Sequence, residues 1–521
     1  MKSIRIVTLI LAMVLALAGC GGGASVDGEE SVLVIGIQDE IEGTDIQQIG
    51  WENVVQALIY EPLVVFSEDL SVMHPALAES YEIAADGLSI KFTLQEGLQF
   101  SNGNVCDAQA VKASVERYLS ISEYAGDLEA VTSVEVLDPL TVQYNLSSPA
   151  PYMWASIAST YGGIVDAAAA AEVSDDEFNR AAVTIGPYAV ESWAQGSEIV
   201  LVRNEYYKTV SPLVSGKTAP AFDKIVVRFI PDEFTRVSEL ESGNVDIIFD
   251  VPSSSIQDLQ SNKDINTYLY KQAGATYINL QTGYGPTESI KVREAIAYAL
   301  DKEEIATALD GVVTPLYGFI SEAQAGYSPD KEADYASTYA FDAEKAKALL
   351  AEDGWTDSDG DGIVDKNGEK LTIELLTSSD RATIKAAAPV IQTQLQAVGI
   401  DLQLREYESS YIKQMMKDDD YIAGTRNFVW NDADILYYVF TENSGYPWSD
   451  PSVTAALEAA RYVVDPAERV QAYEDAQDQL IPLMKAVSLF ADNYCIATKK
   501  SVSGLVVTND GRTYFNDVTK E

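Results

Sequence analysis

The chain has 521 residues, 47% of them hydrophobic and 9% aromatic, so it is long enough for two or three globular lobes rather than a single core. Its 80 acidic residues outnumber its 35 basic residues and give a formal net charge of −45. This excess excludes nucleic acid as a partner, because phosphate binding needs a basic surface. Two explanations of the charge stay open: attraction of a cationic ligand, or solubility in a salty medium, where charges are screened within about 8 Å.

The N-terminus has the features of an export signal. Two basic residues precede an apolar run over residues 6–16, which is too short to span a bilayer with ease. The run leads into Leu17-Ala18-Gly19-Cys20, which looks like a lipobox. We expect residues 1–19 to be a cleaved signal peptide, Cys20 to be lipidated and residues 20–30 to be a flexible tether. An ordinary secretory signal with an incidental cysteine is the alternative.

The mature chain is expected to be a soluble body held by lipid to the outer side of the cytoplasmic membrane, at the cell surface or in the periplasm. No later stretch reaches the ~18 apolar residues that a membrane span needs. Two further cysteines, Cys106 and Cys495, remain in the mature chain. Outside the cell they could form a disulfide, although we favour two unpaired, buried thiols.

Hydrophobic patterns predict a strand-rich first half. An unbroken apolar run over residues 32–37 predicts a buried strand, and strict alternation over residues 88–94 predicts a half-buried one. Further strands are predicted over residues 225–230 and 245–249, joined by a stretch, 231–243, that can hold a helix. Few long helices are expected before about residue 270.

Beyond that point, predicted helices alternate with strands, which favours an α/β lobe. Pro389 lies inside one helical pattern and predicts a kink or a late helix start there. No internal repeat is present. The helices are predicted from apolar spacing or capping residues over 290–300, from Asp301, from Asp342 to Gly354, over 384–398 and from Asp465-Pro466, with strands over 371–376 and 400–404.

Seven short motifs follow one another along nearly all of the mature chain. They are YEPL at 60–63, LAES at 77–80 with NG at 102–103, GPY at 186–188 with RN at 203–204, IPD at 230–232 with SGNVD at 242–246, VREAIAYALD at 292–301, AKALL at 346–350 with GW at 354–355, and the segment 392–400. The motif at 292–301 is the most specific. In this order they resemble the family 5 extracellular solute-binding proteins, which include the dipeptide-, oligopeptide- and nickel-binding proteins of ABC importers.

The resemblance implies an α/β, bilobal fold of the periplasmic-binding-protein type II, with an extra N-terminal subdomain, that closes on its ligand like a clamp. One lobe would hold residues 31–272 and 489–521, and the other residues 273–488, with hinge crossings near 273 and 488. The implied function is capture of an oligopeptide-like ligand for the permease of an ABC importer, by a monomer with no cofactor. A receptor on the same fold for a sugar, a metal chelate or a signalling peptide is the alternative.

The family's peptide binders carry a Trp followed shortly by an Asp that meets the ammonium group of the ligand. Trp430 matches the Trp, but Ala433 stands where the acid is expected, with Asp432 and Asp434 on either side of it. The resemblance therefore implies that one of these two carboxylates makes a charge-assisted hydrogen bond to a ligand amine. The altered spacing does not say which one.

Other residues are candidates for contact with the ligand. Arg426 is the best partner for a ligand carboxylate, because its guanidinium can bind one through two hydrogen bonds; pairing with Asp432 is the alternative. Asn431 lies in the same segment, and Trp51 follows the first strand, where it either stacks on the ligand or packs against the protein. Trp154 and Trp448 are expected to be packing residues.

An acidic turn resembles the start of a calcium loop. Asp357, Asp359, Asp361 and Asp365 alternate so that their carboxylates can converge on one cation. Position twelve of the loop is Gly368 instead of the expected Glu, and a strand is expected to follow. A structural calcium site and a plain acidic turn both remain open.

The sequence offers little to an enzyme. His74 is the only histidine, so a Ser-His-Asp triad, a Cys-His pair or a zinc, nickel or haem site would have to use it. It precedes Pro75 in a segment typical of an exposed connector. No Walker A loop and no G-x-G-x-x-G motif is present. These observations favour a binding protein over an enzyme.

Overall fold

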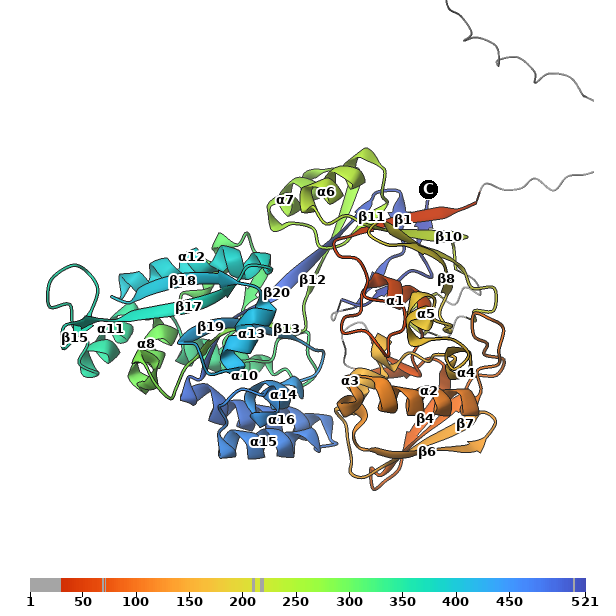
Figure 1. Ribbon diagram of the computed structural model, residues 1–521, viewed down its shortest axis with the longest axis horizontal. Helices are drawn as coiled ribbons and strands as arrows, with labels where there is room; N and C mark the ends of the chain where they lie inside the picture. Colours follow the sequence, from red (N-terminus) through yellow and green to blue (C-terminus); the bar gives the residue numbers. More distant parts are fainter. Residues whose placement is uncertain (1–29, 68–69, 71, 209–210, 216–219, 509–510) are drawn as a thin grey trace, which may run out of the picture.

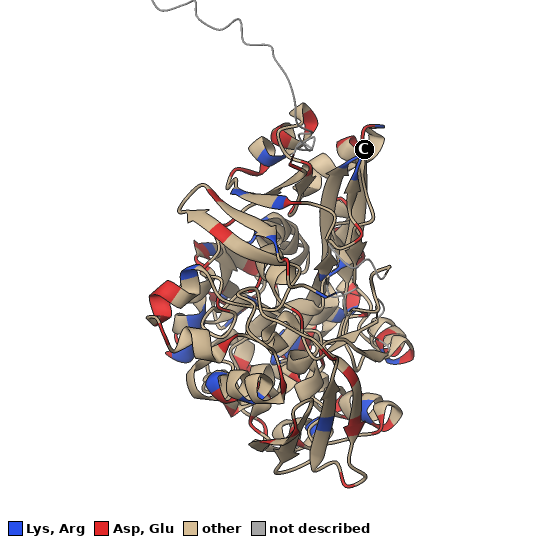
Figure 2. Ribbon diagram, turned by 90° about the vertical axis from the view of Figure 1, so that its right-hand side faces the viewer, with Lys and Arg blue, Asp and Glu red and all other residues tan. Residues whose placement is uncertain are grey.

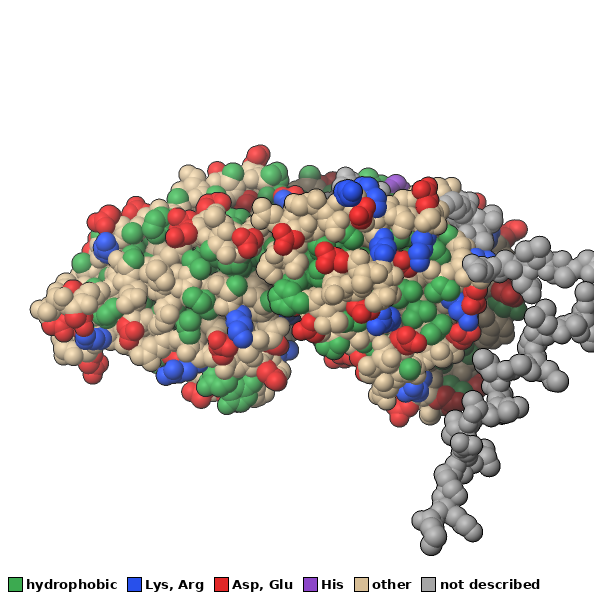
Figure 3. Space-filling model, turned by 90° about the horizontal axis from the view of Figure 1, so that it is seen from above, with side chains coloured by type: hydrophobic (Ala, Val, Ile, Leu, Met, Phe, Trp, Pro, Cys, Tyr) green, Lys and Arg blue, Asp and Glu red, His purple; other side chains and the backbone are tan. Residues whose placement is uncertain are grey.

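The computed structural model describes residues 30–521 except 68, 69, 71, 209, 210, 216–219, 509 and 510. The predicted signal peptide, the lipidation site Cys20 and almost all of the tether lie outside the described residues. The chain forms two lobes that lie side by side (Figure 1), and the space-filling view shows a notch between them (Figure 3). Within the described part of the chain, no helix combines the length and apolarity needed to cross a membrane.

One mixed sheet runs through both lobes. Among the described residues it has 12 strands in the order β18-β17-β19-β13-β20-β11-β1-β10-β9-β8, with β12 and β14 also paired to β20. Its strands are β1 (Val32–Ile37), β8 (Tyr188–Ala194), β9 (Glu198–Arg203), β10 (Lys224–Phe229), β11 (Ile247–Ile248), β12 (Ile265–Lys271), β13 (Gly274–Leu280), β14 (Val313–Pro315), β17 (Thr372–Ser378), β18 (Asp401–Tyr407), β19 (Ala423–Val429) and β20 (Ala486–Lys499).

Lobe I is built around β1, which pairs in parallel with β10 and β11. The predicted strands near 32–37, 225–230 and 245–249 are confirmed, and a helix lies within 231–243 as expected. Apolar side chains of these strands are buried because strands in the middle of a sheet are covered on both faces. The helices of lobe I are α1 (Val54–Ile59), α4 (Ala167–Ala170), α5 (Asp175–Arg180), α6 (Glu233–Ser242) and α7 (Ser253–Ser261).

A subdomain of lobe I has its own sheet and its own core. The sheet runs β4-β5-β7-β6, and the alternating segment 88–94 forms β5. The sequence interpretation missed the helix α2, which Asp107 caps by accepting from two backbone N–H groups. The bounds are β4 (Ala78–Ile83), β5 (Ser89–Leu94), α2 (Ala108–Ile121), η1 (Ala125–Leu128), β6 (Val131–Asp138), β7 (Thr141–Leu146) and α3 (Met153–Ile157).

Lobe II contains the predicted alternation of helices and strands. The helix α12 begins seven residues before Pro389 and continues past it, so the late start is wrong. Gly354 ends its helix with φ +91°, as a stop residue does. The helices are α8 (Ile290–Ala299), α9 (Lys302–Ala308), α10 (Pro329–Thr338), α11 (Ala343–Glu352), α12 (Ala382–Ala397), α13 (Ser409–Lys417), α14 (Ile435–Phe440), α15 (Pro451–Arg461) and α16 (Pro466–Leu480).

Strands carry the chain between the lobes. It leaves lobe I between β12, which ends at Lys271, and β13, which begins at Gly274. It returns along β20, whose partner changes from β14 at Asp492 to β12 at Asn493. In Figure 1, β12 and β20 lie at the junction of the two lobes, above α14, α15 and α16. The two lobes therefore share one continuous strand.

The structure tests what the sequence predicted for the two cysteines, the single histidine and Trp154. Cys106 and Cys495 are both free and buried, in separate cores, so the favoured expectation of unpaired thiols is confirmed and the alternative of a disulfide is wrong. His74 is half-buried in the short strand β3 (Met73–Pro75) and is not on an exposed connector. Trp154 packs in the subdomain at 5.5 Å from the Tyr81 ring, as a packing residue should. Acidic residues lie on helices, strands and loops alike (Figure 2).

Candidate functional site

The lobes approach each other at two aromatic side chains. Trp430 follows β19 in lobe II, and its backbone N–H donates to the carbonyl of Ala273 at 2.8 Å, which fixes it beside the hinge. Its ring centroid lies 6.3 Å from that of Tyr161 in lobe I. Sequence reasoning missed Tyr161, because a tyrosine in a three-residue 3-10 turn, Thr160–Gly162, has no distinctive spacing. Trp430 and Tyr161 therefore bring the two lobes close together at this point.

Arg426, on β19, is held by neutral groups of lobe II, because it interacts with the side chains of Tyr277 and Tyr446. Its Nη1 donates to the carbonyl of Ser409 at a long 3.4 Å. No carboxylate among the described residues lies within ion-pair distance of it, and its buried Nε–H has no acceptor there. Burial lowers the pKa of the nearby Lys413 ammonium, and Lys417 and Arg426 lower it further. This side of lobe II is therefore locally positive in a strongly acidic protein and suits an anion.

Asp432 and Asp434 already have partners inside lobe II. Arg469 donates to both oxygens of Asp432, at 2.6 and 2.9 Å, and Arg461 donates through Nε to Asp434 at 2.9 Å. Both carboxylates are buried, at 4% and 2% exposure. Burial raises the pKa of Asp434 to about 6, against the opposing effect of Arg461. A ligand amine would have to displace an arginine to reach either acid, and neither acid pairs with Arg426.

These two arginines could have been found from the helical pattern. Arg469 stands at the start of the apolar face that continues through Tyr473, Ala476 and Leu480 of α16. Arg461 likewise lies on the buried face of α15. A charged residue on an apolar helix face needs a buried partner of opposite charge. The pattern predicts that such a partner exists, but it does not say which carboxylate supplies it.

Trp51 is the most exposed of the residues predicted to contact the ligand, at 65%. Its loop is anchored because the hydroxyls of Tyr124 and Tyr161 both donate to the carbonyl of Gly50, at 2.8 and 3.1 Å. Asn431 is placed differently, because its side-chain oxygen is buried without a hydrogen-bond donor among the described residues. Lobe I therefore presents Trp51 to solvent, whereas the Asn431 side chain faces the protein.

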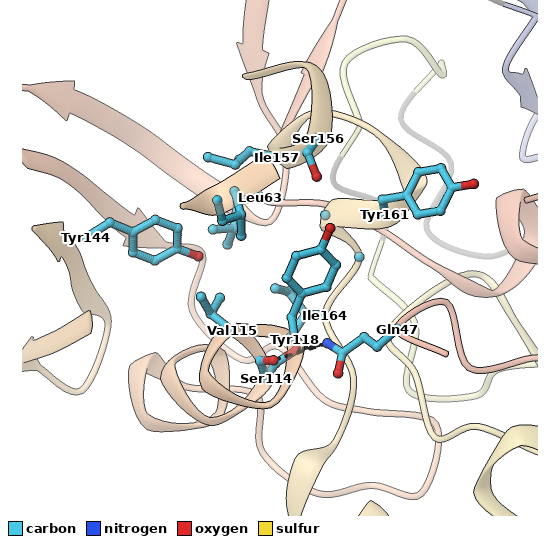
Figure 4. Close-up of a pocket in the computed structure, with 13 residues that line it drawn as sticks. Gln47, Leu63, Ser114, Val115, Tyr118, Tyr144, Ser156, Ile157, Tyr161 and Ile164 are labelled. Atoms are coloured by element: carbon cyan, nitrogen blue, oxygen red, sulfur yellow. Dashed lines mark hydrogen bonds between the residues drawn. The ribbon is translucent and has the colours of Figure 1, made fainter. Parts of the chain in front are cut away.

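Two cavities of very different size lie in the described part of the protein: one has room for a water molecule and the other for a small ligand. The cavity shown in Figure 4 is about 20 Å³, lies behind Tyr161 and is lined by Gln47, Ser114 and Tyr118 among others, so it can hold one water molecule and no solute. A larger hollow of about 640 Å³ lies along β12, with Glu322 and Ala323 of lobe II on one side and residues 505–507 of lobe I on the other. Its size suits a small ligand. None of the sequence-predicted site residues lines it.

The acidic turn gives no support to the calcium expectation. Carboxylate oxygens of Asp357, Asp359 and Asp361 lie within 4.8 Å of one another. Lys370 already provides a positive charge, because its ammonium pairs with Asp359 and Asp361. Asp365 does not join the group, and its side chain accepts from the backbone and hydroxyl of Ser358. These contacts are those of a plain acidic turn followed by the short strand β15 (Asp365–Lys366).

Comparison with known proteins gives the same fold and one family. The chain is 28% identical over 390 residues to the nickel-binding periplasmic protein of Escherichia coli K12, covering 70% of this chain and 68% of that protein. It is 24% identical over 475 residues to the oligopeptide-binding protein AppA of Bacillus subtilis, covering 86% and 84%. The solved structure of the PBP AgaA from A. tumefaciens R10, in complex with agropinic acid, superposes with a TM-score of 0.73 at 28% identity, over 94% of this chain and 99% of AgaA.

The family model of the bacterial extracellular solute-binding proteins, family 5 Middle, matches residues 72–450. The match includes the subdomain, β8 to β19 and the loop that carries Trp430, so it covers both lobes. It is a family of solute-binding proteins rather than enzymes. The chain therefore belongs to the family 5 bacterial extracellular solute-binding proteins.

Proposed function

We propose that this protein captures a peptide-like or chelate-like solute between its lobes and delivers it to the permease of an ABC importer. The observation that carries the proposal is the placement of Arg426 and Trp430 together on lobe II, at the point where Trp430 meets Tyr161 of lobe I. A solute there would touch both lobes, and a ligand that touches both lobes favours the closed form. Relatives with this fold are named for nickel and for oligopeptides.

The charges favour recognition of the ligand through a carboxylate. Arg426 lacks a carboxylate partner among the described residues, whereas Asp432 and Asp434 are each bound by an arginine. We therefore assign ligand contact to Arg426, Trp430 and Trp51, and treat the two aspartates as supports of the loop that carries Trp430. Agropinic acid, the ligand of AgaA, is by name an acid.

The experiment is isothermal titration of the refolded, ligand-stripped protein with short peptides, nickel–histidine and agropinic acid. A carboxylate-bearing solute should bind, and Arg426→Gln should weaken it about 10- to 100-fold, as for the loss of a charge-assisted hydrogen bond. Arg405→Gln, on the exposed strand β18, is the matched control and should leave affinity unchanged. Equal affinity for the free and the carboxyl-amidated peptide would remove the assignment of Arg426.

We also propose that Cys20 is acylated and holds a monomer to the outer side of the membrane. The support is the sequence pattern around Cys20 and the acidic stretch that follows it. Metabolic labelling with an alkyne fatty acid should mark the wild-type protein and not Cys20→Ala, which should appear in the medium or periplasm. We place the lobe boundaries at residues 272–273 and 492–493, where the strand partners change.

A further inference from the structure

A second contact joins the lobes, away from the hinge strands. The side chain of Arg461, at the end of α15, is only 2% exposed, and its Nη1 lies 3.0 Å from Oε1 of Glu129 in the subdomain of lobe I. The ring of Tyr152, also in the subdomain, lies 4.2 Å from the guanidinium carbon. Tyr152 and Tyr462 make a further edge contact at 6.3 Å across the same boundary. In Figure 1, α14 and α15 of lobe II approach α3 of the subdomain below the hinge strands.

Arg461 is fixed in position by lobe II alone. Its Nε donates to Asp434 at 2.9 Å, its Nη2 donates to the Tyr438 hydroxyl at 3.0 Å, and the Tyr437 ring lies 4.1 Å from its Cζ. Only Nη1 is left for the other lobe. When the lobes part, Arg461 loses Glu129 and the face of Tyr152 but keeps its lobe II partners. The guanidinium is therefore pre-organised, and little entropy is lost when it engages Glu129.

We propose that Arg461, Glu129 and Tyr152 form an interlobe latch that biases the clamp toward closure whether or not solute is present. The proposal goes beyond solute capture, since it concerns the energy of closure and names residues away from Arg426 and Trp430.

The test measures the distance between the lobes in solute-free protein by single-molecule FRET. The dyes are attached at Gln109→Cys on α2 and Ala351→Cys on α11, both exposed positions, in a protein that carries Cys20→Ala and in which Cys106 and Cys495 are buried. Arg461 is left intact, because its removal would leave Asp434 buried without a cation. Glu129→Arg replaces attraction by repulsion, and Glu135→Arg makes the same charge change on an exposed part of β6 as the control.

Glu129→Arg should lower the closed-to-open ratio about fivefold or more at pH 7, as for the loss of a partly exposed ion pair, whereas Glu135→Arg should match the wild type. The latch is overturned if Glu129→Arg and Glu135→Arg give the same distances. This result does not depend on the identity of the solute, so failure here leaves the proposed function standing.

Discussion

Arg469 donates to both carboxylate oxygens of Asp432, at 2.6 and 2.9 Å, within the core of lobe II. The pair ties α16 to the loop after β19, and that loop carries Trp430. Ion pairs of this kind contribute little net stability compared with apolar packing, but breaking one leaves a buried charge without a partner. Asp432 therefore helps to hold this loop in position. We expect its removal to lower the folding stability of the protein in the first place.

Asp432→Ala should therefore lower the free energy of unfolding by about 3–5 kcal/mol, because Arg469 would remain buried without its carboxylate. Denaturant unfolding followed by circular dichroism gives the value. Asp475→Ala, an exposed change on α16, the helix that carries Arg469, should leave the free energy of unfolding within about 0.5 kcal/mol of the wild type. A fully stable Asp432→Ala protein with weakened solute binding would instead restore this acid as a ligand residue.

Glu61 should make stability depend on pH. It is buried, Tyr207 donates to it at 2.7 Å, and burial raises the pKa of its carboxyl to about 7. Because the folded pKa lies above the ordinary value near 4.3, the folded state holds this proton more tightly, and the contribution to stability is lost as pH rises from about 5 through 7.

Glu61→Gln should accordingly gain roughly 1–3 kcal/mol over the wild type at pH 8 and almost nothing at pH 4, since the amide never ionises. Unfolding midpoints at the two pH values test this, with Glu79→Gln, an exposed change, as the comparison. If the advantage at pH 8 is absent, the carboxyl is ionised in the folded protein at little cost and its raised pKa is contradicted.

Gly186 should tolerate no side chain. A Cβ there would lie 2.1 Å from the carbonyl carbon of Ile59, which is backbone and cannot move aside easily. Gly186→Ala should cost about 2–4 kcal/mol or prevent folding, as overpacking of a close backbone contact does. At Gly126 an added Cβ meets nothing within 4 Å, so Gly126→Ala should change the unfolding midpoint little. Equal midpoints for the two variants would mean that the approach to Ile59 is looser than the structure has it.

Calcium should leave the protein unchanged. Lys370 already neutralises the acidic turn at Asp359 and Asp361, so a cation would have to compete with it. Thermal unfolding in millimolar calcium and in excess chelator should give the same Tm, because a ligand raises Tm only if it binds the folded state. A Tm that rises with calcium and returns with chelator would reinstate the site.

The sequence predicted the fold better than the site, for a physical reason. The run at 32–37 and the helix start at Asp301 follow from local rules, and Asp301 does accept from the Glu304 N–H at 3.0 Å. The partner of Asp434 is not local: Arg461 stands 27 positions away, and only the packing of α15 brings it there. Local spacing could show that a carboxylate was present near Trp430, but it could not show that this carboxylate was already paired with an arginine of the protein.

The helix α2 was missed for a related reason. Its apolar face, which includes Val111, Val115 and Tyr118, is interrupted by polar residues, so the period is weak in a segment surrounded by strands. Its Asp107 cap was the better signal. Likewise, Tyr161 and Tyr124 are ordinary tyrosines in sequence, and their role as anchors of the Gly50 carbonyl comes only from tertiary contacts.

The strand β20 has a consequence for how the chain matures. It occupies Ala486–Lys499, close to the C-terminus, yet it is the neighbour of β11, β12, β13 and β14. Until these residues emerge from the ribosome, the strand edges in both halves remain unpaired, and neither half can complete its sheet. Loss of this one segment would leave strand edges unpaired in both halves at once, and unpaired strand edges favour aggregation.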